Sequence, residues 1–429
     1  MLKTDSILSK KIFKRDLADK ISRWIKDREL ILLLGSRQTG KTNLLYYMIQ
    51  SLVRDEKVDP GDIYYLDAEN LDDAELIASG PEKIAGFLNA DSKKKKYLFI
   101  DEIHFVRDIG RILKQLVDHY SDSIKIFATG SSALEIKRHF RESMTGRKIV
   151  FEVIPLTFRE FLVFREQDGL IKTYDRFSGL NNAGEPPPAE KRKFLELYSE
   201  YCVYGGYPRV VLEPEIEKKK AVIDEIYSSY VRRDVMSFFE IENPDKFNSL
   251  LKYLALNSGQ ILNIETAVKD IGGVARKTVE KYMGIMESTY IIRRITPFFK
   301  RKTREIVKMG KVYFRDGGMR NRIINNYKMP RDRTDGGFVY ETAVFMNLHK
   351  YTGSVENIKF WRSKSGNEVD FIIDEENISC IEVKMSPGNF KPQAMDAFMG
   401  EYKPAVFIIL NGAENSNKNG FTFKPIYLL

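Results

Sequence analysis

The sequence is poor in cysteine and has no long apolar run. Its two cysteines, Cys202 and Cys380, lie far apart and have no His or Cys partner at metal-ligand spacing. This argues against a disulfide framework and against a zinc site. No stretch approaches the roughly 18 apolar residues of a membrane-spanning helix, and residues 1–14 are polar and basic rather than signal-like. We therefore expect a cytoplasmic protein without a membrane partner, in which both thiols are buried.

The composition is that of a globular protein. Hydrophobic residues make up 43% of the 429 residues and charged residues 30%, a balance typical of packed domains. One hydrophobic core rarely organises so long a chain, so we expect two or three domains.

Positive charge is in excess and is concentrated in one segment. The formal net charge is +9, which favours polyanionic partners such as DNA. Between residues 293 and 311 a single acid, Glu305, accompanies eight cationic residues: Arg293, Arg294, Lys300, Arg301, Lys302, Arg304, Lys308 and Lys311.

A glycine-rich loop follows the first apolar run. Residues 30–34 predict a buried strand, and residues 43–52 have helical spacing. Between them lie Gly35, Ser36, Arg37, Gln38, Thr39, Gly40, Lys41 and Thr42, the spacing of a P-loop. Its backbone N–H groups and the helix N-terminus would hold the phosphates of ATP. Lys41 would reach the β- and γ-phosphates, and Thr42 would bind Mg²⁺.

Two acids follow another apolar run, as in a Walker B motif. Residues 97–100 predict a strand that delivers Asp101 and Glu102 at its carboxyl end, where open α/β sheets bind ligands. Asp101 would hold the Mg²⁺ shell, and Glu102 would act as the base or orient the attacking water. A third run, residues 124–128, ends in Thr129, Gly130, Ser131 and Ser132, whose hydroxyls could sense the γ-phosphate.

In combination, the motifs of the first half resemble a prokaryotic family of AAA+-type ATPases with a C-terminal domain formerly of unknown function. The matching segments are GSRQTGKT (Gly35 to Thr42), YLFIDEIH (Tyr97 to His104), ATGSSALEI (Ala128 to Ile136), TGRKIVFEVIPLTFREF (Thr145 to Phe161), YGGYP (Tyr204 to Pro208) and YVRRDV (Tyr230 to Val235).

The resemblance implies an arginine finger at Arg147, which a homo-oligomer would supply in trans. The alternative is a surface arginine held in a salt bridge. Arg232 and Arg233 could likewise touch the nucleotide or pair with Asp234.

Residues 243–292 show three short helical patterns separated by turn residues, as in a helix-turn-helix. In the third pattern, Arg276, Lys277 and Lys281 lie opposite the apolar positions. The cationic segment that follows could form a wing, and the resemblance also implies a winged-helix module here. Such a module would bind DNA phosphates or serve as an internal packing module.

The C-terminal third predicts a hairpin that gathers two acids and a lysine. A turn centred near residue 376 places Asp370 opposite Glu382 on one sheet face, and Lys384 shares that face because strand side chains alternate. Two carboxylates can bind Mg²⁺, and a neighbouring lysine can orient water or stabilise charge during phosphodiester cleavage.

The hairpin resembles the PD-(D/E)xK nuclease fold. Asp370 and Glu382-x-Lys384 match that motif, and Glu341 in the preceding helix corresponds to the accessory acid. The departure is Val369, where the motif has proline. A salt-bridge cluster on a sheet edge, or a nuclease-like domain kept only for binding, would give the same pattern.

These observations predict an α/β protein in three parts. Residues 1–235 would form an AAA+-type ATPase core with a helical lid, residues 236–312 a winged-helix module, and residues 313–429 a restriction-endonuclease-like domain. The expected function is ATP hydrolysis with Mg²⁺, acting on DNA. The alternatives are an ATP-dependent switch or scaffold that binds protein partners, and a DNA translocase with an inactive nuclease domain.

Overall fold

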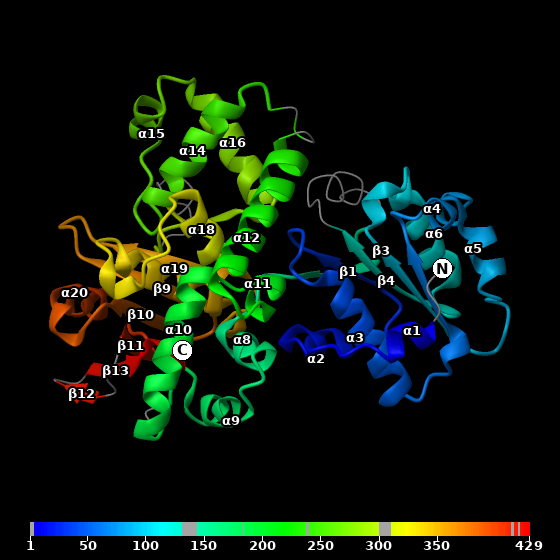
Figure 1. Cartoon of the computed structure of the whole chain (residues 1–429), viewed down its shortest axis with the longest axis horizontal. Helices are drawn as coiled ribbons and strands as arrows, with labels where there is room; N and C mark the ends of the chain where they lie inside the picture. Colours follow the sequence, from blue (N-terminus) through cyan, green and yellow to red (C-terminus); the bar gives the residue numbers. More distant parts are fainter. Residues whose placement is uncertain are drawn as a thin grey trace. The chain divides into compact units, whose positions relative to one another are not determined.

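The computed structural model describes residues 4–130, 144–182, 184–236, 239, 241–299, 310–412, 416–418 and 421–429, with backbone only at 232–234, 387, 416–418 and 421. The chain divides into two compact units, Met1–Ile154 and Pro155–Leu429. Figure 1 labels the helices and strands of both units.

The first unit is built on a parallel five-stranded sheet with the order β2-β3-β4-β1-β5. Helices α1–α3 contribute to the core on one face, and α4–α6 pack together as a second group (Figure 1). The strands are β1 (Leu30–Leu34), β2 (Ile63–Asp67), β3 (Lys96–Asp101), β4 (Ile124–Gly130) and β5 (Lys148–Glu152), and the helices are α1 (Thr4–Leu8), α2 (Asp16–Ser22), α3 (Lys41–Arg54), α4 (Leu71–Ala78), α5 (Pro81–Phe87) and α6 (Ile109–Tyr120).

The parallel arrangement explains the composition of the central strands. All residues of β1 and β4 are buried, because helices on both faces of a parallel sheet leave no solvent side. The carboxyl ends of β1, β3 and β4 meet at one edge of the sheet. The glycine loop, Asp101 and Thr129 therefore come together although they are far apart in sequence.

The second unit begins with helices that share a core with its C-terminal sheet. Phe158, Tyr198 and Tyr201 cluster with Tyr340 and Phe345. The prediction had assigned these helices to the ATPase domain, but their apolar faces are buried in the second unit. The helices are α8 (Phe158–Phe164), α9 (Asp168–Phe177), α10 (Pro188–Tyr204), α11 (Pro208–Leu212) and α12 (Ile216–Ile226), followed by a π-helical segment, Tyr227–Val235.

A middle part follows, with its own apolar cluster. Its helices are α14 (Pro244–Leu256), α15 (Ile264–Asp270), α16 (Arg276–Ser288) and α18 (Gly317–Ile323), and its antiparallel strands are β6 (Ile292–Ile295) and β7 (Lys311–Phe314). Ile261 forms one further bridge to Lys311. The domain boundary predicted after residue 312 falls inside β7.

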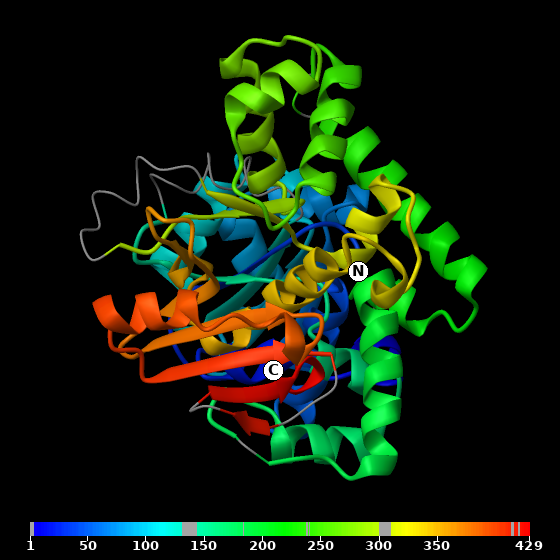
Figure 2. The same ribbon diagram turned by 90° about the vertical axis from the view of Figure 1, so that its left-hand side faces the viewer.

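The C-terminal part is a six-stranded sheet with the order β12-β13-β11-β10-β9-β8 (Figure 2). Phe371 and Ile381 pack with residues of α19, whereas Ile372 and Cys380 pack with Phe398 of α20, so one helix covers each face. The elements are α19 (Gly336–Leu348), β8 (Ile358–Arg362), β9 (Glu368–Asp374), β10 (Ile378–Lys384), α20 (Gln393–Glu401), β11 (Val406–Asn411), β12 (Ser416–Lys418) and β13 (Phe421–Pro425).

Both cysteines are buried free thiols, as the sequence predicted. Burial raises the pKa of each thiol. Across the described ranges, no helix combines the length and the apolar character needed to cross a bilayer.

The YGGYP segment surrounds a buried carboxylate. Asp316 is 2% exposed, and it accepts hydrogen bonds from the backbone N–H of Gly206 at 2.7 Å and of Met319 at 2.9 Å, the latter capping α18. Burial raises the pKa of Asp316 to about 6 in spite of these bonds. Gly205 has a φ of +79°, and a Cβ there would lie 2.2 Å from Asp316 Oδ1, so only glycine fits.

We expect Gly205→Ala to lower the free energy of unfolding by about 3 kcal/mol or more, because the methyl group collides with a carboxylate held by two backbone donors. Gly273→Ala is the matched control: its φ is +72°, but nothing lies within 4 Å of the added Cβ. The control should lower the free energy of unfolding by only about 1 kcal/mol, the cost of a left-handed backbone conformation for alanine. Urea unfolding measures both free energies, and equal losses would contradict a collision between the added methyl group and Asp316.

Candidate functional site

The glycine loop is positioned by close backbone contact with the end of β5. A Cβ on Gly35 would lie 2.2 Å from the carbonyl oxygen of Val153, so a side chain is excluded. Gly40, just before α3, has a φ of +91°, and Gln38 has a φ of +61°. These left-handed residues curl the loop over the helix N-terminus, as a phosphate cradle requires.

Lys41 is folded onto the loop. It is 4% exposed, and Nζ donates to the carbonyl oxygens of Gly35 at 3.3 Å and Ser36 at 3.1 Å. Glu102 Oε1 lies 3.6 Å from the same ammonium. The buried cation is thus held at the mouth of the loop by groups that phosphate oxygens would replace.

Asp101 is the centre of a hydroxyl cluster. It is 4% exposed, and its carboxylate accepts hydrogen bonds from Thr42 at 2.6 Å, from Tyr65 at 2.9 Å and from Thr129. Burial and the charge of Asp101 raise the pKa of Tyr65, which keeps that hydroxyl a donor. Tyr65, in the middle of β2, belongs to no motif, so the sequence pattern does not reveal it.

Glu102 has an unusual backbone conformation, with a φ of +50°. Its N–H donates to Thr129 Oγ1 at 2.9 Å, and His104 Nδ1 lies 3.2 Å from its carboxylate. Glu102 therefore lies between Lys41 and His104 at the edge of the sheet. Such strain in a non-glycine residue is typical of functional sites. Ser131 and Ser132, the other proposed sensors, lie outside the described residues.

Arg15 is a further buried cation behind the loop. It is 5% exposed and donates to the carbonyl oxygens of Thr39 at 3.0 Å and Ile154 at 2.8 Å. It thereby ties the glycine loop to the chain after β5. No spacing rule connects Arg15 to the P-loop, so no pattern in the sequence predicts this contact.

Arg147 lies at the opposite edge of the same sheet. Its carbonyl oxygen accepts from the N–H of Leu30, the first residue of β1, whereas the glycine loop follows the last residue of β1. Five residues of strand span about 16 Å, which exceeds the reach of an arginine side chain. Arg147 forms an ion pair with Asp118 of α6 and lowers the pKa of that acid. It cannot serve the nucleotide site of its own chain.

A second candidate site lies in the C-terminal sheet. Lys384 Nζ is 2.5 Å from Glu382 Oε1 and 3.7 Å from Asp370 Oδ2, so the three predicted side chains do come together. Both acids are 6% exposed. Burial and the charge of Asp370 raise the pKa of Glu382 to about 8.

The path of β9 explains how Asp370 reaches this site. The register pairs Ile381 with Phe371, which agrees with the predicted turn. The pairing of β9 with β8, however, shifts between Lys359 and Trp361. Val369 and Ile372 pack in one cluster and Phe371 in the other, so strict alternation is broken at Asp370. Such an irregularity redirects a side chain.

Glu341 approaches from α19 and is 9% exposed. It accepts a hydrogen bond from Tyr313 at 3.0 Å, and burial together with the charge of Asp370 raises its pKa to about 8. Within the described part of the chain, no group of three or more His, Cys, Asp or Glu is arranged to hold a metal ion. Glu341 is therefore near the pair of Asp370 and Glu382 without completing a three-acid ligand set.

Lys311 is the residue that the sequence analysis did not place here. It is 1% exposed, and Nζ lies 2.6 Å from Glu368 Oε1 and 3.7 Å from Asp370 Oδ1. Burial opposes its charge, but Glu341, Asp370 and Glu368 raise its pKa overall. By its place in the sequence it belongs to the cationic segment of the predicted DNA-binding wing, but its side chain is buried among acids.

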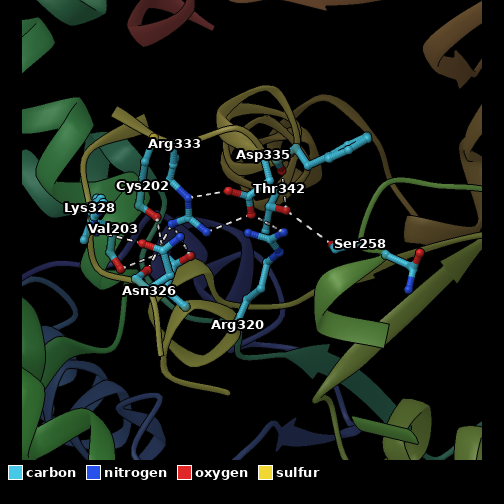
Figure 3. A network of polar contacts seen from close by, with 12 residues as sticks. Cys202, Val203, Ser258, Arg320, Asn326, Lys328, Arg333, Asp335 and Thr342 are labelled. Carbon is cyan, nitrogen blue, oxygen red and sulfur yellow. Dashed lines mark hydrogen bonds and ion pairs between the residues drawn. The ribbon is translucent and has the colours of Figure 1, made fainter. Parts of the chain in front are cut away.

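Next to Glu341, a network of hydrogen bonds and ion pairs links the middle part to α19 and the residues just before it (Figure 3). Arg320 of α18 donates one hydrogen bond to Asp335, at 2.9 Å. Arg333 donates two to the same carboxylate, at 2.6 and 2.8 Å. Ser258 and Thr342 place their hydroxyl oxygens 3.4 Å apart. The neighbouring Gly259 is so close that a Cβ there would lie 2.9 Å from Glu341 Oε2.

Four described cations of the middle part have acidic neighbours. Arg276 pairs with Glu265 and Glu280, each at 2.9 Å, and Lys281 lies 3.4 Å from Glu242. Arg293 pairs with Glu356, and Arg294 with Glu287. The remaining cations of the predicted wing, Lys300, Arg301, Lys302, Arg304 and Lys308, lie outside the described residues.

Three family models match successive stretches of the chain. Residues 27–162 match a model described as an AAA domain. Residues 195–329 and 336–429 match two domains of unknown function, DUF8612 and DUF4143. The first match covers the glycine loop, the Asp101 cluster and Arg147, and it supports an AAA+-type ATPase that binds and hydrolyses ATP. The two others assign no activity.

Similar chains extend over most of the protein. An uncharacterised protein of Methanocaldococcus jannaschii is 27% identical over 381 residues, which is 87% of this chain and 77% of the relative. An uncharacterised protein of Haemophilus influenzae is 25% identical, with 81% of this chain and 80% of the relative covered. Among solved structures, a Walker-type ATPase of Pyrococcus abyssi matches with a TM-score of 0.45 and 13% identity, covering 73% of this chain and 96% of that one.

We expect Lys41→Ala to weaken ATP binding about 100-fold, because it removes the cation at the loop, equivalent to about 3 kcal/mol. Glu102→Gln should bind ATP normally but slow its hydrolysis about 100-fold or more, because the amide keeps the shape of the base without its proton affinity. Binding of a fluorescent ATP analogue and phosphate release measure the two effects. Wild-type turnover in both variants would contradict the assignment.

Proposed function

We propose that the protein is a Mg²⁺-dependent ATPase that acts on DNA in the cytoplasm. The observation that carries the ATPase is the convergence of Lys41, Thr42, Asp101 and Glu102 at one sheet edge. Mg²⁺, when bound with ATP, neutralises phosphate charge. Thr42 and Asp101 are the residues that would hold it, and their hydroxyl and carboxylate oxygens are the donors that Mg²⁺ prefers.

The remaining residues have distinct roles in this proposal. Lys41 exchanges the carbonyl oxygens of Gly35 and Ser36 for phosphate oxygens, since a charge-assisted contact is stronger than a neutral one. Thr129 orients both acids through its bonds to Asp101 and to the backbone of Glu102. Glu102 accepts the proton of the attacking water or orients it.

Action on DNA is supported by the middle part. Three helices are followed by a pair of antiparallel strands, and Ile261 forms a further β-bridge to β7. This order of elements is that of a winged helix. In the sequence, the cationic segment starts in β6 with Arg293 and Arg294 and ends in β7 with Lys311. Surface ion pairs such as those of Arg276 are weak, so phosphates can compete for these side chains.

A nuclease-like role is supported by the topology of the C-terminal part. A helix, three antiparallel strands, a second helix and a strand parallel to β10 follow one another, with the acids on β9 and β10. Glu382 Oε2 is buried and has no hydrogen-bond partner among the described residues, so a cation would satisfy it. Asp370 and Glu382 would hold Mg²⁺, and Lys384 would orient water.

Particular observations favour the two alternatives. The acidic partners of the cations on α16 and β6 reduce their attraction for phosphate, which favours a switch or scaffold that binds protein. The two lysines against Asp370 compete with a metal ion, which favours a translocase whose nuclease-like domain does not cut.

We further propose that Arg147 acts in trans in a homo-oligomer. Arg147→Ala should lower hydrolysis about 1000-fold, and mixing it with Lys41→Ala chains should restore activity, because each chain supplies the group that the other lacks. Asp118→Asn is the control, since it removes the ion pair of Arg147 and should keep hydrolysis. Phosphate release that is independent of protein concentration, with Arg147→Ala fully active, would favour a simple surface salt bridge.

The DNA hypothesis is tested by cleavage of linear, branched and single-stranded DNA with Mg²⁺ or Mn²⁺, with and without ATP. Asp370→Ala and Lys384→Ala should each abolish cleavage and leave ATP hydrolysis intact, because the Walker residues lie in the other compact unit. Changing Lys300, Arg301 and Lys302 to Ala should flatten the salt dependence of DNA binding by up to about 3 in log–log slope.

The outcomes separate the three functions. Hydrolysis stimulated by DNA without cleavage would favour the translocase. Absence of any salt-dependent DNA binding would favour the switch or scaffold.

A further inference from the structure

Lys311 is a buried cation supplied to the acid site from outside the C-terminal part. It is the first residue of β7, and its backbone is fixed by pairing with Ile295 and by the bridge to Ile261. Its side chain is 2% exposed and ends at Glu368 and Asp370. A fully buried lysine is rare unless it is paired, so these contacts determine where the side chain lies.

Asp370 has a lysine at each carboxylate oxygen. Oδ1 lies 3.7 Å from Lys311 Nζ, and Oδ2 lies 3.7 Å from Lys384 Nζ while accepting the N–H of Val383 at 2.8 Å. A divalent ion binds the lone pairs of the same oxygens. A metal ion that uses Asp370 must therefore compete with both ammonium groups.

The surrounding charges show what Lys311 changes. Four acidic side chains, Glu341, Glu368, Asp370 and Glu382, lie among three cationic groups, Lys311, Lys384 and Arg362, the last at 3.5 Å from Glu368. Without Lys311, only Lys384 and Arg362 would balance the negative charge of these acids. The electrostatic attraction of the site for a divalent ion would therefore grow. Glu382 Oε2, which is buried and has no hydrogen-bond partner in the described part of the chain, is the oxygen such an ion would satisfy.

We propose that Lys311 is a built-in competitor of the divalent ion at Asp370 and Glu382. While its ammonium occupies Glu368 and Asp370, the site binds metal weakly. This inference rests on the proposed metal site of the C-terminal part and adds a residue from β7 that sets its affinity.

The test is a titration of the full-length chain with Mn²⁺, followed by electron paramagnetic resonance of the free ion. All chains carry Asp101→Asn, which removes the metal ligand of the ATP site. Lys311→Met should bind one Mn²⁺ at least about tenfold more tightly than the parent, because methionine keeps the length of the side chain without its charge. Adding Asp370→Asn should abolish that binding.

Two variants serve as controls. Lys311→Arg keeps the charge and should retain the weak binding of the parent. Lys359→Met changes a lysine of the neighbouring strand that bonds to Thr296, and it should leave Mn²⁺ affinity unchanged. Thermal unfolding gives a second measure, since Mn²⁺ should raise the melting temperature of Lys311→Met more than that of the parent.

The results distinguish the proposed metal site at Asp370 and Glu382 from the proposed competitor role of Lys311. If Lys311→Met binds Mn²⁺ no better than the parent while Asp370→Asn still removes binding, the metal site stands and the competitor role of Lys311 is overturned. If neither the parent nor Lys311→Met binds Mn²⁺, the metal site itself fails, and the inference fails with it. Should Lys311→Met not fold, Lys311→Gln carries the same expectation, because its amide still donates to Glu368.

Discussion

A charge removed from water must be compensated inside the protein, and the two candidate sites are both organised around a buried carboxylate. Asp101 is surrounded by the hydroxyls of Thr42, Tyr65 and Thr129, which come from α3, β2 and β4. Asp370 is surrounded by lysines from β7 and β10. The need to satisfy one carboxylate therefore fixes several segments that are distant in sequence.

The two solutions differ in what they leave for a metal ion. Hydroxyl donors stabilise Asp101 without placing a positive charge beside it. The ammonium groups of Lys311 and Lys384 do neutralise Asp370, and Glu341 and Glu382 respond to burial beside it with a raised pKa of about 8. Neutral donors therefore surround the first carboxylate, whereas two cationic side chains lie against the second.

Local patterns predicted the parts of each site that depend on short spacing. The strand, loop and helix around Lys41 and the turn that sets Asp370 near Glu382 depend on neighbouring residues, and the structure has both. Tyr65 and Lys311 reach their acids across long sequence separations, so no periodicity reveals them. The shift in register beside Asp370 is equally hidden, because it depends on how β8 packs.

The boundary predicted after residue 312 shows why the C-terminal acids cannot be understood as a separate domain. That boundary divides β7, which carries Lys311 to Glu368 and Tyr313 to Glu341. Gly259 also lies close to Glu341, and any larger residue at position 259 would displace the carboxylate of Glu341. The middle part thus forms one wall of the acid site. Any chemistry at Asp370 is consequently tied to the packing of β7, which places the ammonium of Lys311 against the carboxylates.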